Sequence, residues 1–123
     1  MDFKDNKPIY RQIIDYSFNC ILSGMWEPDQ RIPSVRELAV GMSVNTHTVL
    51  KAFEYMQAHD IIYPRRGMGF FLASDAKERV NGTRREEFYN ETLTSLFAEM
   101  KMLDIDMTDI MEQWRRYNNP EQQ

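Results

Sequence analysis

Residues 32–51, with the sequence IPSVRELAVGMSVNTHTVLK, decide the fold of this chain. Ser34, followed three residues later by Glu37, predicts a capping box at a helix start, in which the two side chains bond each other's backbone N–H groups. Residues 41–44 interrupt this helix, and Asn45 is a favourable cap for another one. The stretch therefore predicts two short helices joined by a tight turn.

The second of these helices has two contrasting faces. One face is an apolar stripe at the helical spacing of three and four residues, formed by Val49, Ala52, Phe53 and Met56. The other face begins with small polar side chains and has a basic residue one turn later: Thr46, His47, Thr48 and Lys51. Short polar side chains at a helix start allow close approach to a DNA major groove, where they reach base edges. The pattern favours a recognition helix.

The segment after the second helix predicts a β-hairpin. Residues 61–63 (IIY) and 69–72 (GFFL) are strand-like, and residues 64–68 (PRRGM) form the tip between them. Gly67 and Gly69 could also indicate a phosphate loop, but no helix follows and the other glycine of that signature is missing. The glycines fit a tip that turns and lies close to a DNA backbone. A hairpin after two short helices predicts a winged helix-turn-helix.

These motifs resemble those of a known family. The order P-S-V-R-E-L-A, V-N-T-H-T-V, K-A-F-E and R-R-G-M-G-F-F is similar to the winged-helix regulators of the GntR family, and the VN-x-x-TV-x-KA form looks like its small YtrA-type branch. The resemblance covers residues 8–72 closely and the rest weakly. It implies a transcriptional regulator, with repression as the expected mode, and control of a transporter operon.

The resemblance also implies which residues bind DNA. Ser34 and Arg36 match the P-S-x-R positions, which touch DNA in the family. Many relatives have arginine in place of Thr46 and Leu50, so their base specificity does not carry over, and Lys51 is the candidate phosphate anchor. The complete predicted set is Ser34, Arg36, Asn45, Thr46, His47, Thr48, Lys51, Arg65, Arg66 and Gly67.

Alternatives remain for several of these side chains. Arg36 could form a surface ion pair, and Asn45 and Thr48 could serve as helix caps alone. Two positions also depart from the family, because Ser43 and Asp60 stand where it usually has glycine in turns. Aspartate tolerates the left-handed conformation better than most residues, whereas Ser43 leaves the tightness of its turn in question.

Composition narrows the function classes. The net charge is −4, yet residues 1–73 hold eight basic and eight acidic residues, so the acidity belongs to residues 74–123. Local potential decides phosphate binding, and the first part can still gather its cations on one face. One cysteine, Cys20, and two histidines offer no metal-site spacing, and we expect no cofactor. Without a membrane-spanning apolar run or an N-terminal signal, we expect a cytoplasmic protein.

Residues 74–123 predict a helical appendage. Apolar residues step regularly by four and three along an a/d seam: Tyr89, Leu93, Leu96, Met100, Leu103, Met107, Ile110 and Trp114. We expect one long helix from Asp75 to about Leu103, a break at residues 104–106, and a last helix that folds back as an antiparallel partner. Two helices are too few to enclose a ligand cavity of ~300 Å³. The seam is therefore predicted to be a dimer surface, with an intramolecular core as the alternative.

The sequence thus predicts a mostly α fold with a small β-hairpin. Residues 1–73 form a winged helix-turn-helix DNA-binding domain, in which residues 1–7 are loosely attached, and residues 74–123 form a two-helix dimerisation appendage. The predicted function is transcriptional regulation by a homodimer on an inverted-repeat operator of double-stranded DNA. The rival is a winged-helix protein-interaction module that does not bind DNA. An enzyme is a distant third, because no recognisable motif pairs an acid, base or nucleophile.

Overall fold

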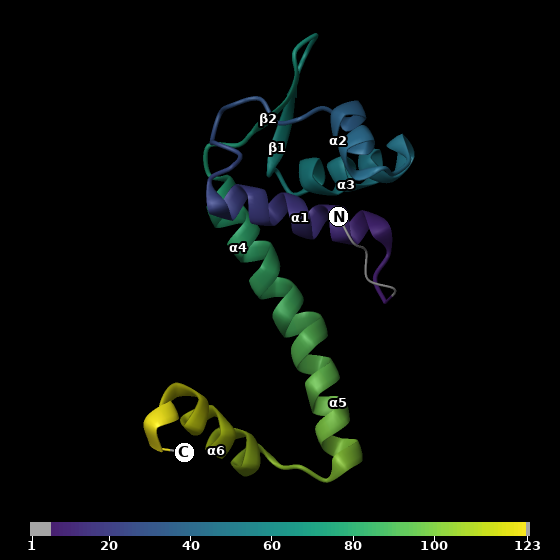
Figure 1. Cartoon of the computed structure of the whole chain (residues 1–123). Coiled ribbons are helices and arrows are strands. Elements are labelled where there is room, and N and C mark those ends of the chain that lie inside the picture. Colours follow the sequence, from purple (N-terminus) through teal and green to yellow (C-terminus); the bar gives the residue numbers. More distant parts are fainter. Residues whose placement is uncertain (1–5, 123) are drawn as a thin grey trace. The chain divides into compact units, whose positions relative to one another are not determined.

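The computed structural model describes residues 6–122. Residues 1–5 of the segment predicted to be loosely attached (residues 1–7) lie outside this range. The chain is mostly helical with a two-stranded antiparallel hairpin, as predicted (Figure 1). It divides into two compact units, Met1–Thr83 and Arg84–Gln123. This grouping reflects contacts, whereas the functional boundary at residue 73 stays a prediction.

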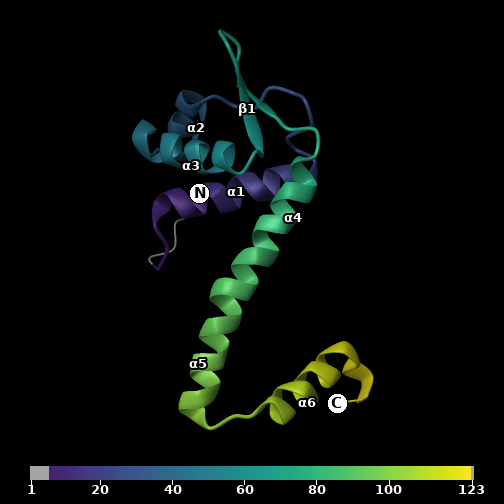
Figure 2. The same ribbon diagram turned by 180° about the vertical axis from the view of Figure 1, so that it is seen from behind.

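The first unit is a winged helix-turn-helix. Its elements are α1 (Ile9–Ser23), α2 (Val35–Met42), α3 (Thr46–Ala58), β1 (Ile62–Arg65), β2 (Gly69–Leu72) and the first part of α4 (Ala76–Glu87). Helices α1 and α2 both pack on α3. The hairpin projects beyond these helices in both views (Figures 1 and 2).

Caps explain where these helices begin and end. The Ser34 hydroxyl accepts the Glu37 N–H, and the Glu37 side chain accepts the Ser34 N–H, which confirms the capping box of α2. Asn45 caps α3, and Gly24 ends α1 with a left-handed φ of 84°. The turn between α2 and α3 is kept although Ser43 replaces glycine, since Ser43 itself is left-handed, with φ of 55°.

The wing gains a third strand-like segment from the loop before α2. Within the hairpin, Ile62 pairs with Leu72 and Arg65 with Gly69. Residues 29–32 run along the other edge of β2, where the Asp29 N–H bonds to the Leu72 carbonyl and the Ile32 N–H to the Phe70 carbonyl, at 2.8 and 2.9 Å. The hairpin tip is shorter than predicted, because β1 extends through Pro64 to Arg65.

One hydrophobic core holds this unit together. The predicted inner face of α3 is fully buried, at Val49, Ala52, Phe53 and Met56. Ala76 and Val80 of α4 join the same core, which explains why the first compact unit extends into α4. Cys20 is buried, and its burial raises the pKa of the thiol.

The second unit contains three helical segments. A π-helical turn, Phe88–Thr92, follows α4 and leads into α5 (Leu93–Leu103), so the prediction of one regular helix to Leu103 was wrong at this turn. A break then separates α5 from α6 (Met107–Asn118), and Asp106 caps α6 through a second capping box with Asp109. A short 3-10 helix, Pro120–Gln122, ends the described chain.

Helices α5 and α6 do not form the expected antiparallel pair. Asp104 turns the chain with a left-handed φ of 55°, and the two helices diverge from this point in both views (Figures 1 and 2). Most of their apolar side chains therefore remain exposed or half-buried, and Met100 is buried. None of the helices within residues 6–122 is long and apolar enough to cross a membrane.

Candidate nucleic-acid interface

The start of α3 presents a polar surface. Asn45, Thr46 and His47 are exposed, and Thr48 is half-buried. The Asn45 Oδ1 accepts the His47 N–H at 2.7 Å, so its carbonyl is committed to the cap and its amide NH2 is left to face outward. Capping and an outward contact are therefore compatible for Asn45.

The first turn of α2 contributes a hydroxyl and a cation. The Ser34 Oγ accepts the Glu37 N–H at 3.0 Å, and its hydroxyl proton can also be donated. Arg36 is exposed, and no hydrogen bond or ion pair within residues 6–122 engages its guanidinium. The alternative of a surface ion pair for Arg36 is thus not seen within the described chain.

Two further predicted cations lie over aromatic rings. The Lys51 Nζ is 4.0 Å from the centroid of the Tyr10 ring, which belongs to α1. The Arg65 guanidinium carbon is 4.6 Å from the centroid of Phe71, on the neighbouring strand of the wing. Both basic residues stay exposed, and cation–π attraction restricts where each charge lies.

The wing tip carries Arg66 and Gly67. Both residues are exposed, and Gly67 has a φ of 74°, a conformation that favours glycine. Within the part of the chain that the structure describes, Arg66 has no hydrogen-bond or ion-pair partner. It is therefore available to an external anion.

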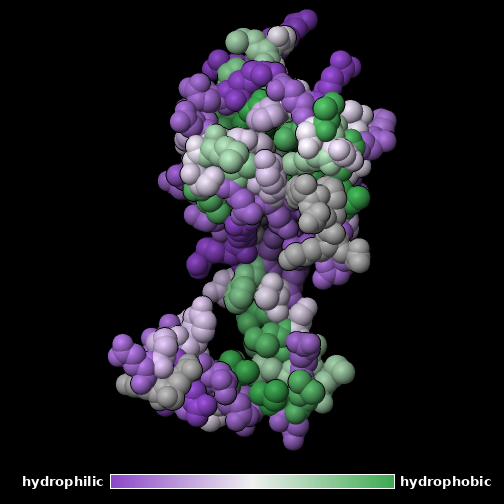
Figure 3. Space-filling model, in the orientation of Figure 1, coloured by the Kyte–Doolittle hydropathy of each residue, from purple (hydrophilic) through white to green (hydrophobic). Residues whose placement is uncertain are grey.

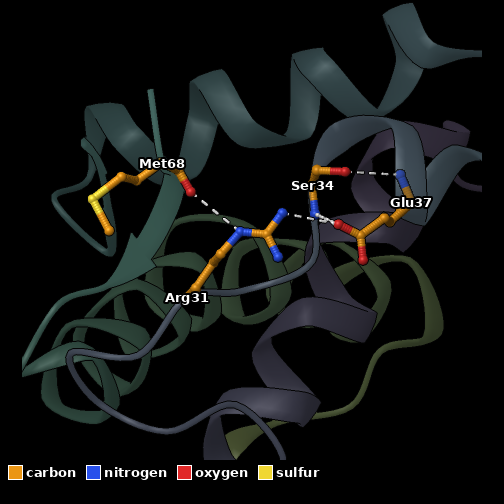
Figure 4. A network of polar contacts seen from close by, with 4 residues as sticks. All are labelled: Arg31, Ser34, Glu37 and Met68. Carbon is orange, nitrogen blue, oxygen red and sulfur yellow. Dashed lines mark hydrogen bonds and ion pairs between the residues drawn. The ribbon is translucent and has the colours of Figure 1, made fainter. Parts of the chain in front are cut away.

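Sequence reasoning missed a residue that connects the wing to α2. The Arg31 Nε donates to the Met68 carbonyl at 3.2 Å, and Arg31 Nη2 lies 3.0 Å from the Glu37 Oε1 (Figure 4). The same carboxylate oxygen accepts the Ser34 N–H at 3.3 Å. The Ser34 N–H, then the Ser34 hydroxyl and then Arg31 lower the pKa of the Glu37 carboxyl, which keeps it ionised.

The sequence holds little signal for this contact. Arg31 lies in a segment that predicts only a loop, 37 residues before Met68. Its position follows from the pairing of residues 29–32 with β2, a long-range arrangement with no local pattern. A basic residue directly before the I-P-S of the capping box is the one clue that could have suggested it.

Comparisons with known proteins identify the family. The family model "Bacterial regulatory proteins, gntR family" matches residues 9–72. The HTH-type transcriptional repressor YtrA of Bacillus subtilis is 38% identical over 106 residues, which cover 86% of this chain and 75% of YtrA. The HTH-type transcriptional regulator YhcF of the same organism is 31% identical over 110 residues, 89% of each chain.

Solved structures agree with this assignment. A GntR-family transcriptional regulator from Bacteroides thetaiotaomicron has a TM-score of 0.76 and 38% identity, covering 93% of this chain and 99% of its own. The DNA-binding domain of AraR, solved in complex with operator ORR3, has a TM-score of 0.54 and 30% identity over 59% of this chain and 88% of its own. The chain therefore belongs to the GntR family of bacterial regulatory proteins, which are DNA-binding transcriptional regulators.

Proposed function

We propose that this chain represses transcription by binding an inverted-repeat operator as a homodimer, with α3 as the recognition helix. The observation that carries the DNA-binding part is the exposed polar start of α3, together with two exposed cations, Arg36 and Arg66. Neither cation has a hydrogen-bond or ion-pair partner among residues 6–122. The repressor name of the relative YtrA supports the sign of regulation.

Each part of this surface has a distinct proposed task. The side chains at the start of α3 contact base edges in the major groove: Asn45, Thr46, His47 and Thr48. Hydroxyl and cationic groups around it contact phosphates: Ser34, Arg36, Lys51 and Arg65. Arg66 enters the adjacent minor groove, where a narrow A·T-rich groove concentrates negative potential, and Gly67 lets the backbone of the tip approach.

The dimer proposal rests on a unit with very few fully buried side chains. Among the described side chains of the second unit, Met100 alone is buried. Several seam residues are largely exposed, among them Leu103 at 68% and Trp114 at 67%, and hydrophobic residues gather over α5 in Figure 3. A second copy of this chain is the natural cover, because two-fold homodimers are the commonest soluble assemblies.

A dimer would also match the geometry of an operator. Two recognition helices related by two-fold symmetry read half-sites roughly 34 Å apart, on successive major grooves of one DNA face. The proposed dimer surface is the whole seam: Tyr89, Leu93, Leu96, Met100, Leu103, Met107, Ile110 and Trp114. In this arrangement one protein dimer binds one palindromic site.

Selection from a random duplex pool, followed by binding at several salt concentrations, tests this function. Each phosphate contact contributes about −0.9 to the slope of log K against log salt. Arg36→Ala and Lys51→Ala should each weaken binding to selected and random DNA alike and make the slope shallower by about 0.9. Lys101→Ala is the matched control, since it removes an exposed cation of α5, outside the first unit.

Two outcomes would contradict the proposal. Failure of the wild-type protein to bind any duplex at low salt would favour the protein-interaction module. Equal losses in Lys101→Ala and Arg36→Ala would mean that DNA attraction is not confined to the proposed surface.

A further inference from the structure

Arg31 bridges two parts of the DNA-binding unit that are distant in sequence. Its Nε donates to the backbone carbonyl of Met68 at 3.2 Å, next to the wing tip. Its Nη2 pairs with the Glu37 carboxylate at 3.0 Å, and that carboxylate belongs to the capping box of α2 (Figure 4). One planar guanidinium thus holds the wing at one end and the start of α2 at the other.

The surrounding backbone is arranged for this contact. Arg31 forms an antiparallel bridge with Phe71, so β2 fixes the direction from which the side chain starts. Gly69 lies directly against the guanidinium, because a Cβ on Gly69 would be 3.2 Å from the Arg31 Nε. Gly69 also has a φ of 102°, so glycine there satisfies both the turn and the close approach.

We propose that Arg31 is a positioning residue that locks the wing to the start of α2 before DNA arrives. The inference rests on the proposed DNA-binding function. A proposed DNA-contacting arginine precedes each end of the bridge: Glu37 is the next residue after Arg36, and Met68 is two residues after Arg66. By fixing Met68 relative to Glu37, Arg31 sets the spacing between a major-groove element and a minor-groove element.

Such a lock has a physical purpose. A two-stranded hairpin is marginally stable alone, and a mobile tip would lose conformational freedom on binding. Holding the tip in place beforehand removes part of that entropic cost. The bridge also neutralises Glu37, a carboxylate that would otherwise lie beside a surface meant for phosphates.

Direct phosphate contact by Arg31 is the competing explanation, because its side chain is 51% exposed. The two roles differ in what they change. A phosphate contact adds to the salt slope, whereas a lock changes affinity through the mobility of the wing and leaves the slope unaltered. The lock also acts in the free protein, where no phosphate is present.

The test combines amide hydrogen exchange of the free protein with DNA binding at several salt concentrations. Arg31→Ala should speed exchange of the Met68 N–H, which bonds to the Arg65 carbonyl at 2.9 Å, by roughly three- to tenfold. Amides in α1 should not change. Affinity for the selected operator should fall roughly three- to tenfold, with the salt slope unchanged.

Arg66→Ala is the matched control, since it removes an arginine of the same tip. Arg66→Ala should make the slope of log K against log salt shallower by about 0.9. It should leave the amide hydrogen exchange of the wing as in the wild type. Arg31→Lys keeps the positive charge but lacks the planar guanidinium that makes both contacts. Its amide hydrogen exchange at Met68 should therefore resemble that of Arg31→Ala. Glu37→Gln keeps a cap acceptor, and its effect should be non-additive with Arg31→Ala, because the two residues act as one unit.

Unchanged Met68 exchange in Arg31→Ala, or additive effects with Glu37→Gln, would overturn the lock. A salt slope that becomes shallower by about 0.9 in Arg31→Ala would assign Arg31 to phosphate contact instead. Wild-type protein that binds no DNA would defeat the proposed function, while the exchange measurement would still decide whether the bridge holds the wing.

Discussion

Leu103→Ala is the sharpest probe of the proposed dimer. Leu103 is the last residue of α5 and a member of the seam, and 68% of it is exposed in the single chain. Its truncation should therefore disturb the folded protomer little. If a second copy covers the seam, the same truncation removes apolar contact from the dimer twice, once in each protomer.

The expected magnitude follows from the exposed fraction. Fully burying a leucine side chain contributes about 1.5–3 kcal/mol. With 68% of Leu103 still to be buried, complete coverage gains about 1–2 kcal/mol per protomer, and about 2–4 kcal/mol per two-fold dimer. Since about 1.4 kcal/mol is a factor of ten, Leu103→Ala should raise the dimer dissociation constant by roughly 30-fold at least, and up to about 700-fold.

Sedimentation equilibrium across a wide range of concentrations measures this change. Met102→Ala is the matched control, because Met102 is the neighbouring residue, is 84% exposed and lies off the seam. It should leave the dissociation constant close to the wild-type value. The reasoning fails if both variants weaken the dimer equally, if Leu103→Ala has no effect, or if wild-type protein is monomeric at about 10–100 µM, the range of an ordinary weak dimer.

Three further predictions concern the first unit. Ser43→Gly should raise the free energy of unfolding by about 1 kcal/mol, because Ser43 has a φ of 55°; urea denaturation measures the gain, and none would mean that the turn is unstrained. The pKa of Glu37 is lowered in the folded protein, so its ionised carboxylate stabilises the fold fully above about pH 4.5, and this stabilisation is lost as pH falls through the folded-state pKa. Glu37→Gln should therefore flatten the acid side of a plot of melting temperature against pH. Thr46 and Leu50 are exposed one turn apart on α3, where their methyl groups can contact the methyl group of a thymine. Replacing such a thymine by uracil should weaken DNA binding about fourfold in the wild type. The same replacement should have no effect on a Thr46→Ser, Leu50→Ala variant.

The sequence predicted the parts of the fold that depend on local chemistry. The caps at Ser34 and Asn45 each satisfy backbone groups within three residues, so a short window of sequence contains all the information. The buried stripe of α3 likewise follows from periodicity. The hairpin follows from two strand-like runs around a glycine-containing turn.

The missed features depend on long-range or cooperative arrangements. The strand-like pairing of residues 29–32 and the Arg31 bridge exist because β2 offers a free edge, which no local pattern records. The π-helical turn at Phe88–Thr92 interrupts a seam whose spacing alone predicts a regular helix. The divergence of α5 and α6 shows that an a/d pattern identifies a face to be covered, but not the element that covers it.

Pro64 protects the wing against pairing with the wings of other copies. Residues 29–32 occupy one edge of β2, and among residues 6–122 β1 pairs with β2 alone, so β1 offers the sheet's outer edge. Exposed edges invite strands of other molecules and lead to aggregation, but Pro64 lacks the N–H that such pairing needs. A proline in the middle of a four-residue strand makes this edge a poor template, so neighbouring wings can lie close together without joining.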